Sequence, residues 1–322
     1  MALREGGTGV RLSSVEDLEF QPDKEKHHAA LVAIGSEPRS TLITERLLKC
    51  GGLQSAVHAL TFEGADDPDI RSHRAWFAER IPKKATSASA DDDTKVYDVL
   101  NGICSLVDGE DELRLLVDYS SMPRSWYSAV LNWFRSQRRS GRVILDFTYA
   151  VGRYGDEWIP KSVKGISAIQ GCDGGPTLRD TKIAVFGLGF DRLAAYSVLE
   201  QIEPDTVLAY IADPGATDEA PDRARKENRE FLDNEVGRIF RLPLDSVETA
   251  YRILGETISA SQGQASVILV PLGPKPHILA SVLAAYRYPG TACLRVVHQR
   301  RAPHRVEAMG QVIATRVVFT RD

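Results

Sequence analysis

Two loops carry the side chains best suited to chemistry. The loop 118–124 follows the apolar run 115–117, and the loop 273–277 follows the apolar run 267–272. Each combines small residues with a cation and leads into a predicted helix, where free backbone N–H groups and the helix dipole favour anions. The pattern predicts an anion or phosphate site in each half of the chain. Its candidate residues are Ser120, Ser121 and Arg124 in the first loop, beside Asp118, and Gly273, Lys275 and His277 in the second.

Each of these loops has a predicted partner at the end of an earlier strand. The partner residues are Gly35, Ser36 and Arg39 in the first half, and Gly187, Gly189, Asp191 and Arg192 in the second. In a doubly wound sheet the two loops of a pair flank one crevice, where ligands bind. The alternative interpretation is that glycine and proline only shape the turns and that the cations are solvated.

The elements that must position these loops occur twice. Apolar strand-like runs alternate with helical patterns in both halves, which predicts parallel sheets with helices on both faces. Gly35 corresponds to Gly187 and Asp118 to Pro271, at an offset of about 150 residues. We therefore expect an α/β fold with two tandem doubly wound, Rossmann-like, mostly parallel sheets, internally duplicated. The expected strand order in each is 3-2-1-4-5.

The composition shifts of the chain suggest where its domains end. We expect an N-terminal lead-in at 1–26, with an edge strand near 10–12, a first Rossmann-like domain at 27–174 and a second at 175–322. A last short strand of the first half should precede the glycine-rich linker. The run 311–319 should form a sixth, antiparallel edge strand of the second half.

Bulk properties and missing motifs exclude several classes. A net charge of -4 argues against a protein that binds nucleic acid over its whole surface. The four cysteines form no CxxC pair, and no apolar run suits a signal peptide or a membrane span, so we expect a cytoplasmic protein with no membrane contact. The chain has no P-loop, no complete GxGxxG and no GxSxG motif, and its histidines lack metal-ligand spacing. No cofactor or metal is expected, whereas a nucleotide ligand is.

Aromatic residues follow the first loop on its helix. They are Trp126, Tyr127, Trp133 and Phe134. Two interpretations remain open from the sequence: the rings pack on the sheet, or they form a platform on which a base stacks.

The two loops resemble a known family. The sequences Asp118-Tyr119-Ser120-Ser121-Met122-Pro123-Arg124 and Leu272-Gly273-Pro274-Lys275-Pro276-His277 are similar to the loop after the fourth strand in CRISPR-associated Rossmann-fold (CARF) and SAVED-like nucleotide-sensing domains. Such domains pair about a two-fold axis and bind a cyclic oligonucleotide between them. The resemblance implies that the tandem chain is similar to a fused pair. The Gly-Gly-Thr-Lys form of the family's loop is absent from both loops.

The sequence thus predicts a nucleotide-sensing protein of a bacterial antiviral defence system. Its expected partners are the nucleotide and a separate effector or defence-complex protein, and a homo-oligomer is allowed. One alternative is an enzyme acting on a nucleotide or a phosphorylated metabolite, with Asp118 as the acid–base group and Ser120 and Arg124 stabilising an anion. Another is an assembly scaffold with vestigial sites. The inventory of motifs favours binding over catalysis.

Overall fold

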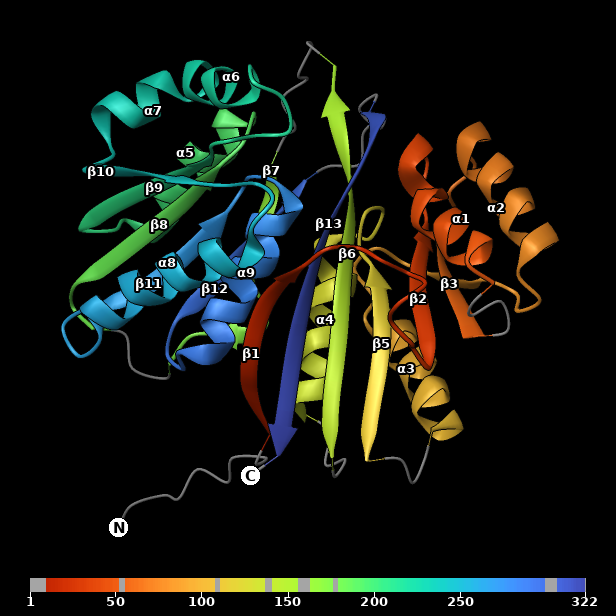
Figure 1. Ribbon diagram of the computed structural model, residues 1–322. Coiled ribbons are helices and arrows are strands. Elements are labelled where there is room, and N and C mark those ends of the chain that lie inside the picture. Colours follow the sequence, from red (N-terminus) through yellow and green to blue (C-terminus); the bar gives the residue numbers. More distant parts are fainter. Residues whose placement is uncertain are drawn as a thin grey trace. The chain divides into compact units, whose positions relative to one another are not determined.

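The computed structural model describes residues 10–51, 56–107, 111–136, 141–155, 163–175, 179–298 and 306–321 (Figure 1). It is an α/β structure with a seven-stranded and a six-stranded sheet. The chain forms two compact units, the first of Met1–Ala150 with Gly310–Asp322 and the second of Val151–Met309.

The first unit contains the seven-stranded sheet. Its strands are β1 (Val10–Leu18), β2 (Ala29–Ile34), β3 (Val57–Phe62), β4 (Thr86–Ala88), β5 (Glu112–Asp118), β6 (Arg142–Tyr154) and β13 (Val306–Arg321). Its helices are η1 (Pro38–Ser40), α1 (Leu42–Lys49), α2 (Pro68–Arg80), α3 (Thr94–Leu106) and α4 (Arg124–Ser136).

The second unit contains the six-stranded sheet. Its strands are β7 (Val163–Asp173), β8 (Lys182–Leu188), β9 (Thr206–Ala212), β10 (Arg238–Leu242), β11 (Ser266–Pro271) and β12 (Ala292–His298). Its helices are α5 (Arg192–Ile202), α6 (Ala220–Glu227), α7 (Arg229–Asn234), α8 (Val247–Ser261) and α9 (Lys275–Arg287).

Both sheets contain the predicted strand order. The order is β1-β13-β6-β5-β2-β3-β4 in the first and β10-β9-β8-β11-β12-β7 in the second. The parallel strands β4-β3-β2-β5-β6 and β10-β9-β8-β11-β12 each follow the order 3-2-1-4-5. The central strands β2 and β11 are buried along their whole length, as expected for strands covered on both faces. The predicted fold class is confirmed.

The domain division differs from the predicted one at 174/175. The chain passes from the first unit to the second within β6, after Ala150, and back to the first within β13, after Met309. The strand β7, expected to end the first half, pairs antiparallel with β12 in the second sheet. The run 311–319, expected in the second half, lies in β13 and pairs with β1 in the first sheet. The amphipathic pattern of such a strand indicates which face it buries and not which sheet edge it joins.

The predicted lead-in at 1–26 is also partly built into the sheet. Residues 10–18 form the edge strand β1, which is longer than the expected strand near 10–12. The chain then crosses one face of the first sheet to reach β2, and Figure 1 shows α4 behind β13 and β6 on the other face. This crossing segment carries the residues of a polar network described below.

The aromatic helix α4 packs into the core of the first unit. Trp126 is fully buried, stacks on Phe62 with ring centroids 4.8 Å apart, and donates its indole N–H to the Ser89 carbonyl. Tyr127, Trp133 and Phe134 are buried as well. The structure therefore favours the packing interpretation of these rings. Among the described helices none combines the length and apolarity required to cross a membrane.

Candidate functional site

The two predicted loops of the first unit come together, as expected from the strand order. Strand β2 lies beside β5, and Gly35 directly follows β2. A Cβ atom at Gly35 would lie 2.9 Å from the Cβ of Ser121, so the missing side chain allows the two loops to touch. Gly35 is itself buried, and Ser36 beside it is half-buried. The small residues at this position serve loop-to-loop packing.

Asp118 and Ser120 form a buried hydrogen-bond network. Asp118 is only 2% exposed, and its carboxylate accepts hydrogen bonds from the Ser120 backbone N–H at 2.9 Å and from the Ser120 hydroxyl at 2.5 Å. The Ser120 hydroxyl in turn accepts a hydrogen bond from the Ala150 backbone N–H at 2.7 Å. These contacts join the end of β5 to β6. The geometry gives Asp118 a structural role.

The two arginines predicted for this crevice are differently placed. Arg39 is fully buried, and it donates to the Glu37 carboxylate at 2.6 Å and to the Ala150 carbonyl at 2.8 Å. Its guanidinium also lies 4.9 Å from the ring centroid of Tyr149. Arg124 is the first residue of α4 and is half-buried. Arg39 is thus held within the fold by its own partners.

A matched pair of serines tests the network at the end of β5. Replacing Ser120 by Ala leaves the Ala150 N–H and the buried Asp118 carboxylate with fewer partners, so the free energy of unfolding should fall by about 2 kcal/mol. Replacing Ser121 by Ala removes a buried hydroxyl that has no hydrogen-bond partner among the described residues, and it should change stability by less than about 0.5 kcal/mol. Urea unfolding of both variants gives the comparison, and equal losses would contradict the structural role of Ser120.

In the second unit the predicted loops also pack against each other. A Cβ at Gly189 would lie 3.0 Å from the Leu272 carbonyl oxygen and 3.2 Å from the Gly273 Cα. Gly189 directly follows β8, as Gly35 follows β2, so Gly189 rather than Gly187 is the structural counterpart of Gly35. Gly187 lies within β8, where its bare Cα accommodates the ring of Tyr210.

His277 lies in a buried cluster on α9. Its Nε2 is 3.0 Å from the Pro243 carbonyl, and its ring meets that of Tyr210 edge-on with centroids 5.6 Å apart. The Ser281 hydroxyl donates to the His277 carbonyl and contacts the Tyr210 hydroxyl at 2.9 Å. Burial lowers the pKa of His277 to about 4, against the opposing effect of the bond to Pro243. The imidazole is therefore neutral at pH 7 and part of the core.

The other predicted residues of this unit lie at helix starts. Asp191 caps α5 by accepting a hydrogen bond from the Ala194 N–H at 3.3 Å. Arg192 is the exposed first residue of α5, and Lys275 is the half-buried first residue of α9. The structure brings Gly189 and Gly273 together, and it holds His277 in the core.

A cavity in the second unit lies beside these loops, and no sequence argument identified it. Its volume is about 430 Å³, and the loops after β8 and β9 contribute Phe190 and Thr217 to its lining. It therefore lies at the carboxyl ends of β8 and β9, next to the switch point between β8 and β11 at which such sheets usually bind ligands. The complete lining is Gly152, Arg153, Tyr154, Gly155, Phe190, Ala216, Thr217, Glu219, Ala220, Arg223 and Glu307.

Aromatic and guanidinium groups face one another in this cavity. The Arg223 guanidinium lies 4.3 Å from the ring centroid of Phe190 and donates to the Gly155 carbonyl at 2.8 Å. Tyr154 meets Phe190 edge-on, with centroids 6.5 Å apart. A flat ring can stack on such a surface, and an anionic group can meet the guanidinium edge. The feature of the sequence that could have indicated this surface is Phe190, the aromatic residue between Gly189 and Asp191.

Acidic groups balance the cations of the cavity. Arg153 pairs with Glu307 at 2.6 Å. The pKa of Glu219 is lowered by hydrogen bonds from its own backbone N–H and from the Thr217 hydroxyl, with a further effect of the Arg153 charge. Two arginines thus oppose two glutamates in the lining. This balance suits a ligand of low net charge that offers both an anionic group and hydrogen-bond donors.

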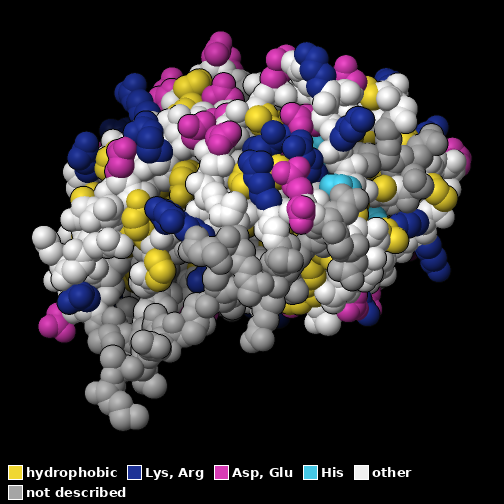
Figure 2. Space-filling view, turned by 60° about the horizontal axis from the view of Figure 1, so that its bottom comes forward, with side chains coloured by type: hydrophobic (Ala, Val, Ile, Leu, Met, Phe, Trp, Pro, Cys, Tyr) yellow, Lys and Arg dark blue, Asp and Glu magenta, His cyan; other side chains and the backbone are white. Residues whose placement is uncertain are grey.

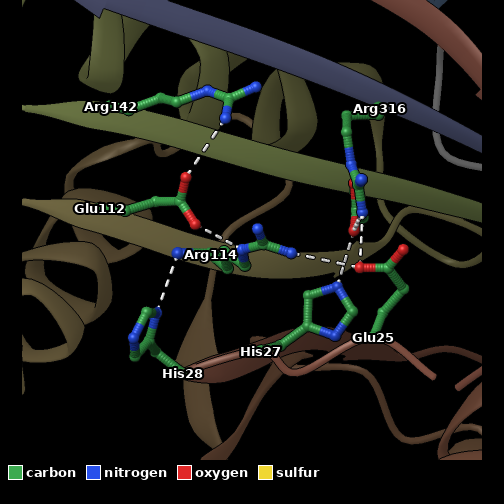
Figure 3. A network of polar contacts seen from close by, with 8 residues as sticks. Glu25, His27, His28, Glu112, Arg114, Arg142 and Arg316 are labelled. Carbon is green, nitrogen blue, oxygen red and sulfur yellow. Dashed lines mark hydrogen bonds and ion pairs between the residues drawn. The ribbon is translucent and has the colours of Figure 1, made fainter. Parts of the chain in front are cut away.

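An ionic network lies in the first unit, where the segment after β1 crosses the sheet (Figure 3). Asp146 on β6 accepts two hydrogen bonds from Arg316 at 2.8 Å and contacts His27 Nε2 at 2.8 Å. Glu25 pairs with Arg316 at 3.0 Å and with Arg114 at 3.2 Å. The side chains of His27 and Asp146 are only 4% and 5% exposed, so the network fastens the crossing segment rather than offering an open site.

Two further observations limit the kind of site. Within the described ranges, no group of three or more His, Cys, Asp or Glu side chains could hold a metal ion. On the face drawn in Figure 2, basic and acidic side chains are interspersed. That distribution differs from the basic stripe of a nucleic-acid interface.

The fold and the cavity define a class: an α/β protein of two doubly wound units, with a cavity at the carboxyl ends of two strands of the second sheet. No protein-family model matches the sequence, and no curated protein matches it. Among solved structures, the chain is similar to a universal stress protein from Archaeoglobus fulgidus, with 11% identity and a TM-score of 0.23, over 83% of this chain and 96% of that one. A similarity at this level carries no argument about function.

Proposed function

We propose that the second unit binds a nucleotide in the cavity beside Phe190 and that the chain acts as a nucleotide sensor. The observation that carries the proposal is the pairing of the Phe190 ring with the Arg223 guanidinium at the carboxyl edge of a parallel sheet. A base stacks on the plane of the guanidinium that covers the ring, and the N–H edge of the guanidinium meets a phosphate. The glutamates accept hydrogen bonds from ribose hydroxyls or base amino groups.

The charges of the lining favour a nucleotide with few phosphates. Arg153 is already paired with Glu307, and a triphosphate would bring its negative charges close to Glu219. A nucleoside monophosphate or a cyclic dinucleotide, with one negative charge per phosphodiester, suits the cavity better. We further propose that the ligand is a cyclic oligonucleotide and that the chain acts in an antiviral defence system through a separate effector. The support for this part is the resemblance of the two loops to CARF and SAVED-like domains.

The geometry favours sensing over catalysis. The enzyme alternative assigned acid–base work to Asp118, whose carboxylate is buried in the network with Ser120. In the cavity, the lowered pKa of Glu219 makes it a weak base near neutral pH, whereas a general base works best with a pKa near the operating pH. A binding role is consistent with both observations.

Calorimetric titration with AMP, cyclic di-AMP and ATP tests the proposal. We expect AMP or cyclic di-AMP to bind more tightly than ATP. Replacing Arg223 by Gln should weaken that binding at least tenfold, because one charge-assisted contact contributes about 1.5–3 kcal/mol. The matched control is Arg229→Gln, which removes an exposed arginine of α7 that pairs with Asp233.

Two outcomes would contradict the proposal. Affinities that are equal in the Arg223→Gln variant and the wild type would place the ligand elsewhere. Steady conversion of a nucleotide to product, followed by chromatography and abolished by Asp118→Asn, would favour the enzyme alternative.

A further inference from the structure

We propose that the first unit contains a separate binding site for an amphipathic anion, a molecule with a carboxylate or phosphate on an apolar body. The site is a cavity of about 700 Å³ lined by α2, by β3 and β4, and by the loops that connect them. This volume is within the range of small-molecule sites. The inference rests on residues of the first unit only, and its test is independent of nucleotide binding in the second.

The floor of the cavity is apolar. Ile34 from the end of β2, Ala59 from β3, and Phe77 and Ile81 from α2 and its C-cap line it, and each is buried. The exposed residues Ala78 and Pro82 lie at its rim. An apolar ligand that covers this floor removes apolar surface from water, which favours its binding. A bare inorganic ion has no apolar surface and would not gain from this contact.

Three cations line the same cavity: Arg74, Lys83 and Lys84. Within the described part of the chain, no carboxylate lies within ion-pair distance of any of them. The acidic residue of the lining, Asp66, pairs with Arg71 on the exposed side of α2. The three positive charges are therefore available to an anionic ligand.

Two of the three cations are held in place by neutral partners. Arg74 donates to the Thr61 hydroxyl at 2.8 Å and to the carbonyls of Phe62 at 2.7 Å and Ala65 at 3.3 Å. The Lys83 ammonium donates to His58 Nε2 at 3.0 Å. Burial and the nearby Lys83 charge lower the pKa of His58 to about 4, so at pH 7 this histidine is a neutral acceptor. Positioned cations of this kind lose little freedom when an anion binds.

The ligand class follows from this division. The cations bind a carboxylate or phosphate group, and the apolar floor binds the hydrocarbon or aromatic body attached to it. Calorimetry with laurate, dodecyl phosphate, dodecanol and inorganic phosphate, all below micellar concentrations, separates these contributions. We expect laurate or dodecyl phosphate to bind with 1:1 stoichiometry, and the stronger of the two identifies the head group. Dodecanol and inorganic phosphate should each bind at least about tenfold more weakly.

Variants locate the binding. The double variant Lys83→Gln/Lys84→Gln changes two exposed residues and should weaken binding of the anion at least about fivefold, with a smaller effect at high salt. Ala78→Trp at the rim should also weaken it by narrowing the entrance. The control Lys49→Gln/Lys226→Gln removes two exposed lysines outside the cavity lining and should leave the affinity unchanged.

Three results would overturn the inference. Dodecanol binding as tightly as both anions would show a purely apolar pocket. Unchanged affinity in the Lys83→Gln/Lys84→Gln variant would place the anion elsewhere. The absence of binding by both laurate and dodecyl phosphate would exclude the proposed class.

Discussion

Replacing Asp146 by Ala is expected to lower the free energy of unfolding by about 3–5 kcal/mol, the usual cost of removing one partner of a buried ion pair. Asp146 accepts two hydrogen bonds from the guanidinium of Arg316 and contacts His27 Nε2. The Arg316 side chain is only 17% exposed. When Asp146 is removed, the Arg316 guanidinium still has an ion pair with Glu25. The value should fall near the lower end of the range because Glu25 remains.

The pH dependence of this contribution follows from the pKa of Asp146. Burial raises that pKa, but the hydrogen bonds from Arg316 and His27 outweigh burial and leave it lower than in the unfolded chain. The unfolded state therefore takes up a proton before the folded state does. The stabilisation is present at neutral pH and is lost as the pH falls through the lowered pKa.

Urea unfolding at pH 7 measures the effect, and Glu25→Ala is the matched control. Glu25 pairs with the same Arg316, but its side chain is 35% exposed, so its removal should cost less than about 1 kcal/mol. A double-mutant cycle between Asp146→Ala and Arg316→Met should give a coupling free energy of at least about 1 kcal/mol. An Asp146→Ala cost as small as that of Glu25→Ala would show that the network contributes little.

His277 should make the second unit less stable as the pH falls from about 6.5 to about 4. An unfolded histidine has a pKa of about 6.5, whereas burial lowers the pKa of His277 to about 4. Between these pH values His277 is protonated in the unfolded state and neutral in the folded state. The free energy of unfolding should therefore fall by up to about 1.4 kcal/mol per pH unit, roughly 3 kcal/mol over the interval.

The variant His277→Gln isolates this effect, because glutamine can donate to the Pro243 carbonyl but does not titrate. We expect the variant to be less stable than the wild type at pH 7 and the difference to shrink by about 2–3 kcal/mol at pH 4. Ser281→Ala disturbs the same cluster without removing a titrating group, so its cost should be independent of pH. A constant difference between His277→Gln and the wild type would contradict the lowered pKa.

The sequence was sufficient for the fold class and for the order of the parallel strands. Strands such as β2 and β11 appear as continuous apolar runs because they are buried on both faces. Right-handed crossovers then allow few arrangements, so the order 3-2-1-4-5 was predictable in both units. The meeting of Gly35 with Ser121, and of Gly189 with Gly273, follows from that order.

The exchange of the two antiparallel strands was decided by the tertiary structure. Strand β7 follows the first unit's parallel strands but pairs with β12, and β13 follows those of the second unit but pairs with β1. Alternating side chains specify which face of a strand is buried. The alternating pattern carries no information on which of two similar open sheet edges a strand joins. For this reason the predicted domain boundary at 174/175 differs from the observed division after Ala150 and after Met309.

The position of the cavities was also a tertiary outcome. The sequence placed small residues and cations at the carboxyl ends of strands, and the structure uses the small residues to pack loops and buries Arg39 and His277 among their own partners. The cavities instead collect residues from segments far apart in the chain, such as Phe190 with Arg223 and Lys83 with Ile34. Local patterns determine what each segment forms, and the empty space between segments depends on how their side chains pack.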